Sequence, residues 1–380
     1  MQVQTQDTPQ AMAPEQLARI DVDTHNLIFE AQVAPYLAKR WQSYLETFGL
    51  RQQAAYGLAV GQHPLAARTD AWGPEGQPPG LEPAFFCQQL LEEHEIDLAI
   101  LNSTLQSSCH MMGPGSPRQL IADLARAGNE YEQEVWLDAD PRLLGAICVA
   151  FEDSQSTVAE IERCAPDSRF LQILLPFRTM DPLGNERYWP MFEAAEHFDL
   201  PISLHPAAQH GETGSGWQSF YFEHHAGLPS ALYSQMASLI FEGVFDRFPR
   251  LQIVFQEGGW SWVAPFMRRL DRSWDQLHSE VPDLEHRPSD YVRRHFWFTT
   301  QPIEEPDRPD QFDQLHEQFA AAGLESRLMF SSDYPHWDFD APAFAIPHSL
   351  SSDAREAIFS GNALGCYSRL ALLPGIPSTP

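Results

Sequence analysis

Apolar runs of strand length recur along the chain, separated by segments of helical or irregular pattern. Eight such runs occur, at residues 19–26, 97–103, 142–151, 170–177, 201–207, 251–259, 296–302 and 327–336. Runs that are apolar throughout are typical of strands buried on both faces, as in a parallel sheet. Between the runs lie segments of helical pattern, such as residues 187–198 and 231–248.

This alternation of eight strands with helices predicts a (β/α)8 barrel, with an open, doubly wound α/β sheet as the alternative. A single domain is expected over residues 18–370, with flexible termini at 1–17 and 371–380. Residues 27–95 form a long segment that includes the turn-rich stretch GPEGQPPG. We interpret it as a loop-rich insertion after the first strand, forming a lid over one end of the barrel.

Charge and composition narrow the class of protein. The chain has 24 basic and 52 acidic residues and a formal charge of -28, which repels nucleic acids and anionic membranes. No apolar run approaches the roughly 18 residues of a membrane span, and the N-terminus lacks a secretory signal pattern. The five cysteines include no C-x-x-C pair, which argues against a disulfide framework or a zinc knuckle. A cytoplasmic protein is expected.

The chain contains a single lysine, Lys39, within the helix-like stretch YLAKRW. Schiff-base chemistry, a P-loop and a lysine-carbamate metal bridge each require a lysine at a defined place. Lys39 does not lie at a predicted strand end, so these three chemistries are not expected.

Polar side chains of metal-ligand type follow several of the predicted strands. In a barrel, the chemistry lies at the carboxyl ends of the strands, where such residues meet. The residues in question are Asp23 and His25 after the first strand, His205 after the fifth, Glu257 after the sixth and Asp333 after the eighth. Two imidazoles and three carboxylates at one mouth predict a divalent cation that offsets the negative charge. An oxygen-rich set of this kind suits manganese, iron(II) or zinc.

Structural alternatives exist for each of these residues. Asp23 and His25 could cap a following turn, Asp333 could form an Asx-turn, and Glu257 could cap the next helix. His205 could be a buried histidine that bonds backbone groups. The agreement among four strand ends favours metal ligation. Asp21, although on the same face as Asp23 by its spacing, is assigned to hydrogen bonding in the barrel wall.

Four motifs carry a resemblance to a known family. IDVDTH resembles the strand-one motif I-D-x-H-x-H of the amidohydrolase superfamily, with Asp23 in place of its first histidine. PISLHP resembles that superfamily's strand-five histidine and SSDYPH its strand-eight aspartate. Residues 241–271 and 298–306 are similar to the amidohydrolase-related branch that includes aminocarboxymuconate-semialdehyde decarboxylase and benzoate decarboxylases. In that branch a histidine often precedes two glycines, where this chain has Glu257.

The resemblance implies a set of site residues. Metal ligands are expected at Asp23, His25, His205 and Asp333, with Glu257 as a ligand, a bridge to a second metal or a proton carrier. Asp333 would act as general acid or base, and Glu257 is a further catalytic candidate. Apart from the resemblance, His336, three residues past Asp333, is also a catalytic candidate, although it could merely lie in a loop. Substrate contacts are expected from Arg178, Trp260 and His225, although Arg178 could instead form a surface ion pair and Trp260 could belong to the core.

The function expected first is a metal-dependent hydrolase acting on a small cyclic or aromatic carbonyl or carboxylate compound. The main alternative is a nonoxidative decarboxylase. Further alternatives are a manganese- or iron-dependent oxygenase and an inactive partner subunit of the same fold. One divalent ion (Zn, Mn or Fe) is expected, with a second possible, in a homodimer or in a hetero-oligomer with a paralogue.

Overall fold

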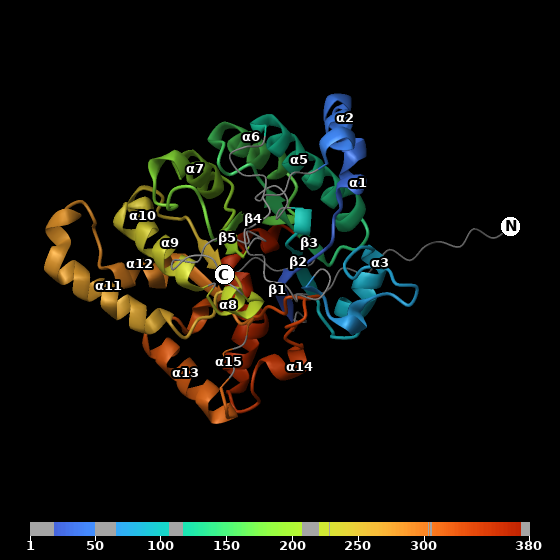
Figure 1. The fold of residues 1–380 in the computed structure, drawn as a ribbon. Coiled ribbons are helices and arrows are strands. Elements are labelled where there is room, and N and C mark those ends of the chain that lie inside the picture. The colour runs from blue at the N-terminus through green and yellow to red at the C-terminus, as the bar shows by residue number, and fades with distance from the viewer. Residues whose placement is uncertain are drawn as a thin grey trace.

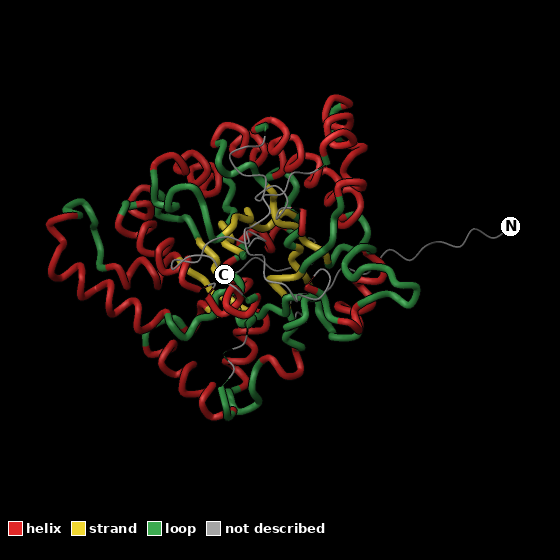
Figure 2. The backbone as a smooth tube through the Cα atoms, viewed as in Figure 1, coloured by secondary structure: helices red, strands yellow, loops and turns green. Residues whose placement is uncertain are grey.

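Eight parallel strands form the centre of the protein. The computed structural model describes residues 19–49, 66–105, 117–206, 220–227, 229–302, 304 and 306–373. The strands are β1 (Ile20–Thr24), β2 (Leu98–Leu101), β3 (Leu143–Cys148), β4 (Phe170–Pro176), β5 (Ile202–His205), β6 (Ile253–Phe255), β7 (Phe296–Thr299) and β8 (Leu328–Met329). They pair in sequence order, and Figure 2 shows them at the centre of a ring of helices. A bridge between Thr24 and Tyr334 joins the first strand to the segment after the last, so the predicted (β/α)8 barrel is confirmed.

Helices surround the strands on the outside (Figure 1). The longer ones are α2 (Lys39–Phe48), α5 (Arg118–Tyr131), α6 (Ser154–Cys164), α7 (Trp189–His197), α9 (Pro229–Phe241), α11 (Val263–Leu277), α12 (Pro288–His295) and α13 (Pro309–Ala321). The shorter ones are α1 (Glu30–Val33), α3 (Pro83–Phe86), α8 (Tyr221–Gly227), α10 (Val244–Arg247), α14 (Pro342–Ala345), α15 (Ser352–Glu356) and α16 (Asn362–Cys366).

The two-residue period of the strands separates two cores. In β5, Ile202 and Leu204 belong to the large apolar core between strands and helices, so Ser203 and His205 face the barrel interior. A second apolar cluster joins residues of the strands to the end of the chain. It contains Ile20, Val22, Leu98, Ile100, Leu144, Leu171, Val254, Trp297 and Met329 together with Ala363, Cys366, Tyr367 and Leu370. The C-terminal segment therefore closes the amino end of the barrel.

The insertion after β1 is more helical than predicted in its described part. Helices α1 and α2 lie beside α5 (Figure 1), where Gln32 Nε2 donates to the hydroxyl of Tyr131 at 2.7 Å. Lys39 begins α2, as the helix-like pattern around it indicated. Closer to the barrel mouth, Arg68 N donates to Pro335 O at 3.0 Å. The lid itself stays a prediction, since residues 50–65 lie outside the described part.

The structure also bears on the predictions about the chain ends, the cysteines and membrane-spanning helices. Residues 1–18 and 374–380 lie outside the described part, while the last described turn, Ser368–Leu372, is a 3-10 helix and includes two residues of the expected flexible end. The cysteines that are described are buried and form no disulfide bond with one another: Cys87, Cys148, Cys164 and Cys366. Among the described helices, none has both the length and the apolar character of a membrane span.

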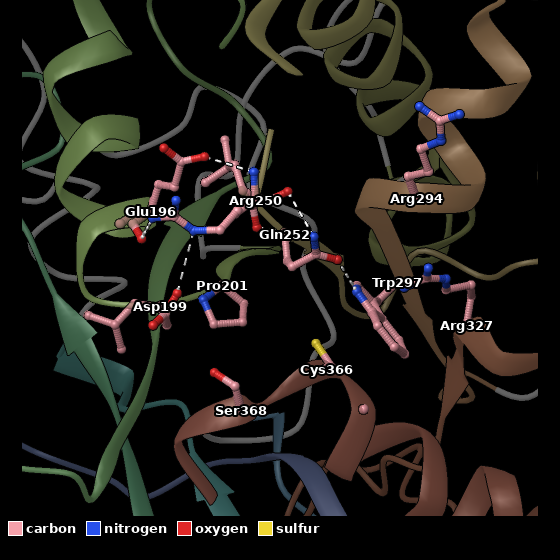
Figure 3. Close-up of a pocket in the computed structure, with 14 residues that line it drawn as sticks. Glu196, Asp199, Pro201, Arg250, Gln252, Arg294, Trp297, Arg327, Cys366 and Ser368 are labelled. Atoms are coloured by element: carbon pink, nitrogen blue, oxygen red, sulfur yellow. Dashed lines mark hydrogen bonds and ion pairs between the residues drawn. The ribbon is translucent and has the colours of Figure 1, made fainter. Parts of the chain in front are cut away.

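A hollow of about 350 Å³ lies at the amino end of the barrel, opposite the strand ends that carry the polar residues (Figure 3). Two of the arginines that line it, Arg250 and Arg327, contact other parts of the fold. Arg250 Nη2 donates to the carbonyl of Glu196 at 3.1 Å. The guanidinium of Arg327 lies 4.2 Å from the ring centroid of Trp297, as in a cation–π contact.

Candidate metal centre

The predicted ligands converge at the carboxyl ends of the strands. Asp23 lies within β1, His25 directly after it and His205 at the end of β5, while Glu257 and Asp333 follow β6 and β8. Ligand atoms of Asp23, His25, His205 and Glu257 all lie within 4.8 Å of one another. A second group, which shares His25 and Glu257 and adds Asp333 and His336, satisfies the same limit.

The distances in the centre are those of side chains crowded around a common point. His205 Nε2 lies 2.5 Å from Glu257 Oε1 and 3.6 Å from Asp23 Oδ1. His25 Nε2 lies 2.9 Å from Asp333 Oδ1 and 3.5 Å from both Asp23 Oδ1 and Glu257 Oε1. Three acidic side chains thus enclose two imidazoles.

Several of these buried atoms lack hydrogen bonds. Within the described part of the chain, no hydrogen bond reaches Nε2 of His25, Nε2 of His205, Oε1 of Glu257 or Oδ2 of Asp23. Buried polar atoms are normally paired, so four orphans at one point indicate that something else is bound there. Imidazole nitrogens with carboxylate oxygens form a donor set suited to zinc, manganese or iron. The group can therefore hold a divalent metal ion.

Two of the site residues have an unusual backbone conformation. Glu257 has φ of 48° and Asp333 has φ of 60°, in the left-handed region that residues other than glycine rarely adopt. Backbone strain of this kind concentrates at functional sites, where the surrounding structure maintains it. For Asp333 the support includes a bond from its N–H to the carbonyl of Asp23 at 3.0 Å.

Asn102 holds two of the candidate ligands and was not predicted from the sequence. Its backbone carbonyl accepts a hydrogen bond from His25 Nδ1 at 2.8 Å, which leaves His25 Nε2 free for a metal. Its side-chain Nδ2 donates to Asp23 Oδ1 at 2.6 Å. The available signal was its place directly after the apolar strand β2, the same position that marked the other site residues.

The β1 strand departs from simple alternation. Its register with β2 is irregular between Asp21 and Thr24. Asp21 Oδ1 accepts hydrogen bonds from the N–H groups of Asp23, at 3.2 Å, and Ser332, at 3.0 Å. Asp21 therefore supports the barrel wall, as expected, and burial raises its pKa to about 7.

The carboxyl groups of the centre have opposite proton affinities. Burial and then repulsion by Glu257 raise the pKa of Asp333 well above its usual range. Burial alone would raise the pKa of Glu257 too, but His205 and His25 outweigh it and hold that pKa well below its usual range. Burial and the nearby His25 lower the pKa of His336 to about 4. Of these two carboxyl groups, Asp333 is therefore the one better suited to carry a proton.

His336 and His225 both reach the region of Asp333. His336 Nδ1 lies 2.6 Å from Asp333 Oδ1, so His336 belongs to the site and not merely to a loop. His225 Nε2 lies 2.8 Å from Asp338 Oδ2. Gln301 Nε2 then connects Asp338 Oδ2, at 3.1 Å, to Asp333 Oδ2, at 3.2 Å. Gln301 follows β7 and could have been found by its strand-end position; Asp338 gave no comparable signal.

Arg178 remains a candidate for binding a substrate carboxylate. It follows Phe177, whose N–H donates to the carbonyl of His205 at 3.1 Å, so Arg178 lies next in the chain to a contact with the site. Its Nη1 is buried without a hydrogen-bond partner among the described residues. Burial also lowers the pKa of Arg178, and no ion pair to it occurs in the part of the chain that is described.

The position of Trp260 differs from the substrate contact expected from the sequence. Its side chain is fully buried and packs against Phe312 and Phe319 of α13, with ring centroids at 5.5 and 5.2 Å. It therefore belongs to the core between barrel and helices, the alternative weighed for it, and not to the substrate site.

The helix-capping alternative for Glu257 is not borne out. Helix α11 begins at Val263, well past Glu257.

Comparison with known proteins agrees with the family resemblance seen in the sequence. The sequence profile of the amidohydrolase family (Amidohydro_2) matches residues 30–369. A gamma-resorcylate decarboxylase of Polaromonas sp. (strain JS666) is 25% identical over 302 residues, covering 73% of this chain and 85% of the relative. A 2-amino-3-carboxymuconate-6-semialdehyde decarboxylase of Dictyostelium discoideum is 23% identical over 296 residues, covering 73% and 74%.

Among solved structures, a dihydroxybenzoic acid decarboxylase of Polaromonas sp. JS666 has the same fold. It superposes with a TM-score of 0.62 at 20% identity and covers 94% of this chain and 97% of its own. That crystal structure contains bound manganese and the inhibitor 2-nitroresorcinol. The relatives named here are decarboxylases, which favours the decarboxylase alternative over the hydrolase interpretation that the sequence placed first.

Proposed function

Because the chain belongs to the amidohydrolase family, we propose that it is a metal-dependent decarboxylase that removes CO2 from a small aromatic carboxylic acid. The observation that carries the proposal is the cluster of buried ligand atoms without hydrogen bonds, beside Asp333, in the described part of the chain. The decarboxylase relatives support the same reaction. The hydrolase interpretation has no comparable support.

Asp23, His25, His205 and Glu257 would hold the metal, with Asp333 beside them. Bound there, the ion would offset the carboxylate charge and polarise oxygen atoms of the substrate. Manganese is the first metal to test, because it occurs in the structurally similar decarboxylase; zinc and iron(II) fit the same donor set.

Asp333 supplies the proton in the proposed reaction. Burial raises the pKa of Asp333 well above its usual range and so favours its protonated form, and it would transfer that proton to the ring carbon that bears the carboxyl group. The bond from this carbon to the carboxyl group then breaks, its electron pair remains in the ring, and CO2 leaves. Asp333 regains a proton from water by way of His336, whose Nδ1 lies 2.6 Å away.

Substrate binding is assigned to groups around the mouth. The unpaired, partly buried guanidinium of Arg178 can bind a carboxylate through two parallel hydrogen bonds. His225 bonds Asp338, which Gln301 connects to Asp333, and it would contact the substrate ring or its hydroxyl groups.

The test is an assay of CO2 release. The protein is purified without chelator, loaded separately with Mn²⁺, Zn²⁺ or Fe²⁺, and offered hydroxylated benzoic acids, with the products identified by chromatography. Asp333→Asn should abolish release, while Asp353→Asn, at an exposed position of α15, should leave it unchanged. Hydrolysis of lactones or amides without CO2 release from any aromatic acid would overturn the proposal.

A further inference from the structure

A group of polar side chains fills the barrel interior beneath the candidate metal centre. Each is at most 1% exposed: Asp23, Asn102, Gln172, Ser203, Gln256 and Tyr367. They come from five strands or strand ends (β1, β2, β4, β5 and β6) and from the C-terminal segment. Polar groups buried this deeply are costly unless they are hydrogen-bonded, so their pairing determines what they do.

The hydrogen bonds among them form a continuous chain that ends on Asp23. The Tyr367 hydroxyl donates to Gln172 Oε1 at 2.8 Å. Gln172 Nε2 donates to Asn102 Oδ1 at 2.9 Å. Asn102 Nδ2 in turn donates to Asp23 Oδ1 at 2.6 Å.

A branch of this chain anchors Asn102 to β6 and β1. The second N–H of Asn102 donates to Gln256 Oε1 at 3.0 Å, and Ser203 Oγ donates to the same oxygen at 2.5 Å. Gln256 Nε2 donates to the carbonyl of Val22 at 2.7 Å, one residue before Asp23. Every side-chain donor and acceptor of Asn102 is thereby used.

The direction of the chain follows from its Asp23 end. The Asp23 carboxylate that would bind a metal only accepts hydrogen bonds, so Asn102 must turn its N–H groups towards it. Its oxygen then faces Gln172 Nε2, and the oxygen of Gln172 requires a donor on its far side. The phenol of Tyr367 is that donor. Rotating the side-chain amide of Gln172 or Asn102 by a half-turn would place two hydrogen-bond acceptors next to each other. The side chains of Tyr367, Gln172 and Asn102 therefore share one hydrogen-bonding arrangement.

We propose that Tyr367, Gln172 and Asn102 are positioning residues that fix Asp23, and through the Asn102 carbonyl also His25, in the orientation that binds the metal. The inference rests on the proposed metal centre and extends it to a tyrosine that contacts none of the ligands. Hydrogen bonds from outer groups to metal ligands typically change metal affinity by about 10- to 100-fold.

The experiment measures Mn²⁺ binding to the metal-free protein by titration calorimetry, without any substrate. Tyr367→Phe removes one hydroxyl group and should raise the dissociation constant by about 10-fold, as for other outer-shell contacts. Tyr291→Phe is the matched control, because that buried hydroxyl also donates a side-chain bond, to Asp246 Oδ1 at 2.5 Å. It should leave the dissociation constant unchanged even where its melting temperature falls.

A double-mutant cycle separates positioning from general stability. If Tyr367 acts through the chain, Tyr367→Phe should have no further effect on Mn²⁺ affinity in the Asn102→Ala background. Gln172→Met, which keeps the volume and removes both hydrogen bonds, gives the same test if the phenylalanine variant does not fold.

The outcomes distinguish the two proposals. Wild-type protein that binds no Mn²⁺, Zn²⁺ or Fe²⁺ would overturn the metal centre and with it this inference. A wild-type protein that binds Mn²⁺, together with Tyr367→Phe and Gln172→Met variants of equal affinity, would overturn the positioning role alone.

Discussion

Replacing Glu132 by glutamine should make the protein more stable at pH 8 than the wild type, and about equally stable at pH 4.5. Glu132 is 2% exposed and accepts one hydrogen bond, from Asn26 Nδ2 at 2.8 Å. Its Oε1 and the Oδ1 of Asn26 are both buried without partners in the described structure. Burial raises the pKa of Glu132 from 4.5 to about 8.

The direction in which stability changes with pH follows from proton binding in the folded and unfolded states. Between pH 4.5 and 8 the folded protein keeps the Glu132 proton and the unfolded chain releases it, so stability falls as pH rises through this window. The slope is about 1.4 kcal/mol for each pH unit, and the loss by pH 8 is at most roughly 5 kcal/mol. Glutamine carries no titrating proton, keeps an acceptor for Asn26 Nδ2 and adds an N–H group.

The assay is thermal unfolding between pH 4.5 and 8.5, followed by circular dichroism. Glu134→Gln serves as the control, since Glu134 lies two positions on in an exposed place and bonds only the hydroxyl of Tyr36 among its described contacts. The Glu132→Gln curve should be flatter against pH than those of the wild type and the control. Three parallel curves would show that Glu132 does not titrate on unfolding and would refute the reasoning.

Three further predictions concern the site. A chelator should abolish activity and lower the melting temperature, and Mn²⁺ should restore both; activity that survives complete metal removal would contradict the metal centre. Arg178→Met should raise KM by about 10- to 100-fold, the equivalent of losing 1.5–3 kcal/mol of charge-assisted hydrogen bonding, with a smaller change in kcat; an unchanged KM for carboxylate substrates would count against a substrate contact. His336→Gln should lower kcat more than it raises KM, because it slows reprotonation of Asp333; an equal effect on both would point to substrate binding instead.

The sequence predicted most of the metal centre because its members occupy equivalent places. Asp23, His205 and Asp333 each lie at the end of a buried strand, and a closed parallel barrel brings those ends together whatever the intervening helices do. The pattern of polar residues at strand ends can therefore be recognised from the sequence, without knowing the distances between these residues.

The pattern of strand ends did not predict the orientation of side chains whose partners are distant in the sequence. Trp260 follows the turn at Gly259, which has φ of 62°, and nothing in the local sequence states whether the ring turns to the mouth or to α13. Tyr367 bonds a residue 195 positions away, and Asn102 one 79 positions away. Such pairings depend on the closed barrel, so they were found only from the coordinates.

The C-terminal segment closes the amino end of the barrel, and this determines when the site can assemble during synthesis. All the candidate ligands and all eight strands have been made once residue 336 leaves the ribosome. At that stage Gln172 Oε1 still lacks the Tyr367 hydroxyl, and the carbonyls of Phe170 and Ala165 lack the guanidinium of Arg369, which donates to them at 2.9 and 2.7 Å. A nascent chain therefore carries every ligand before it can arrange them, and assembly of the centre waits for the last part of the chain.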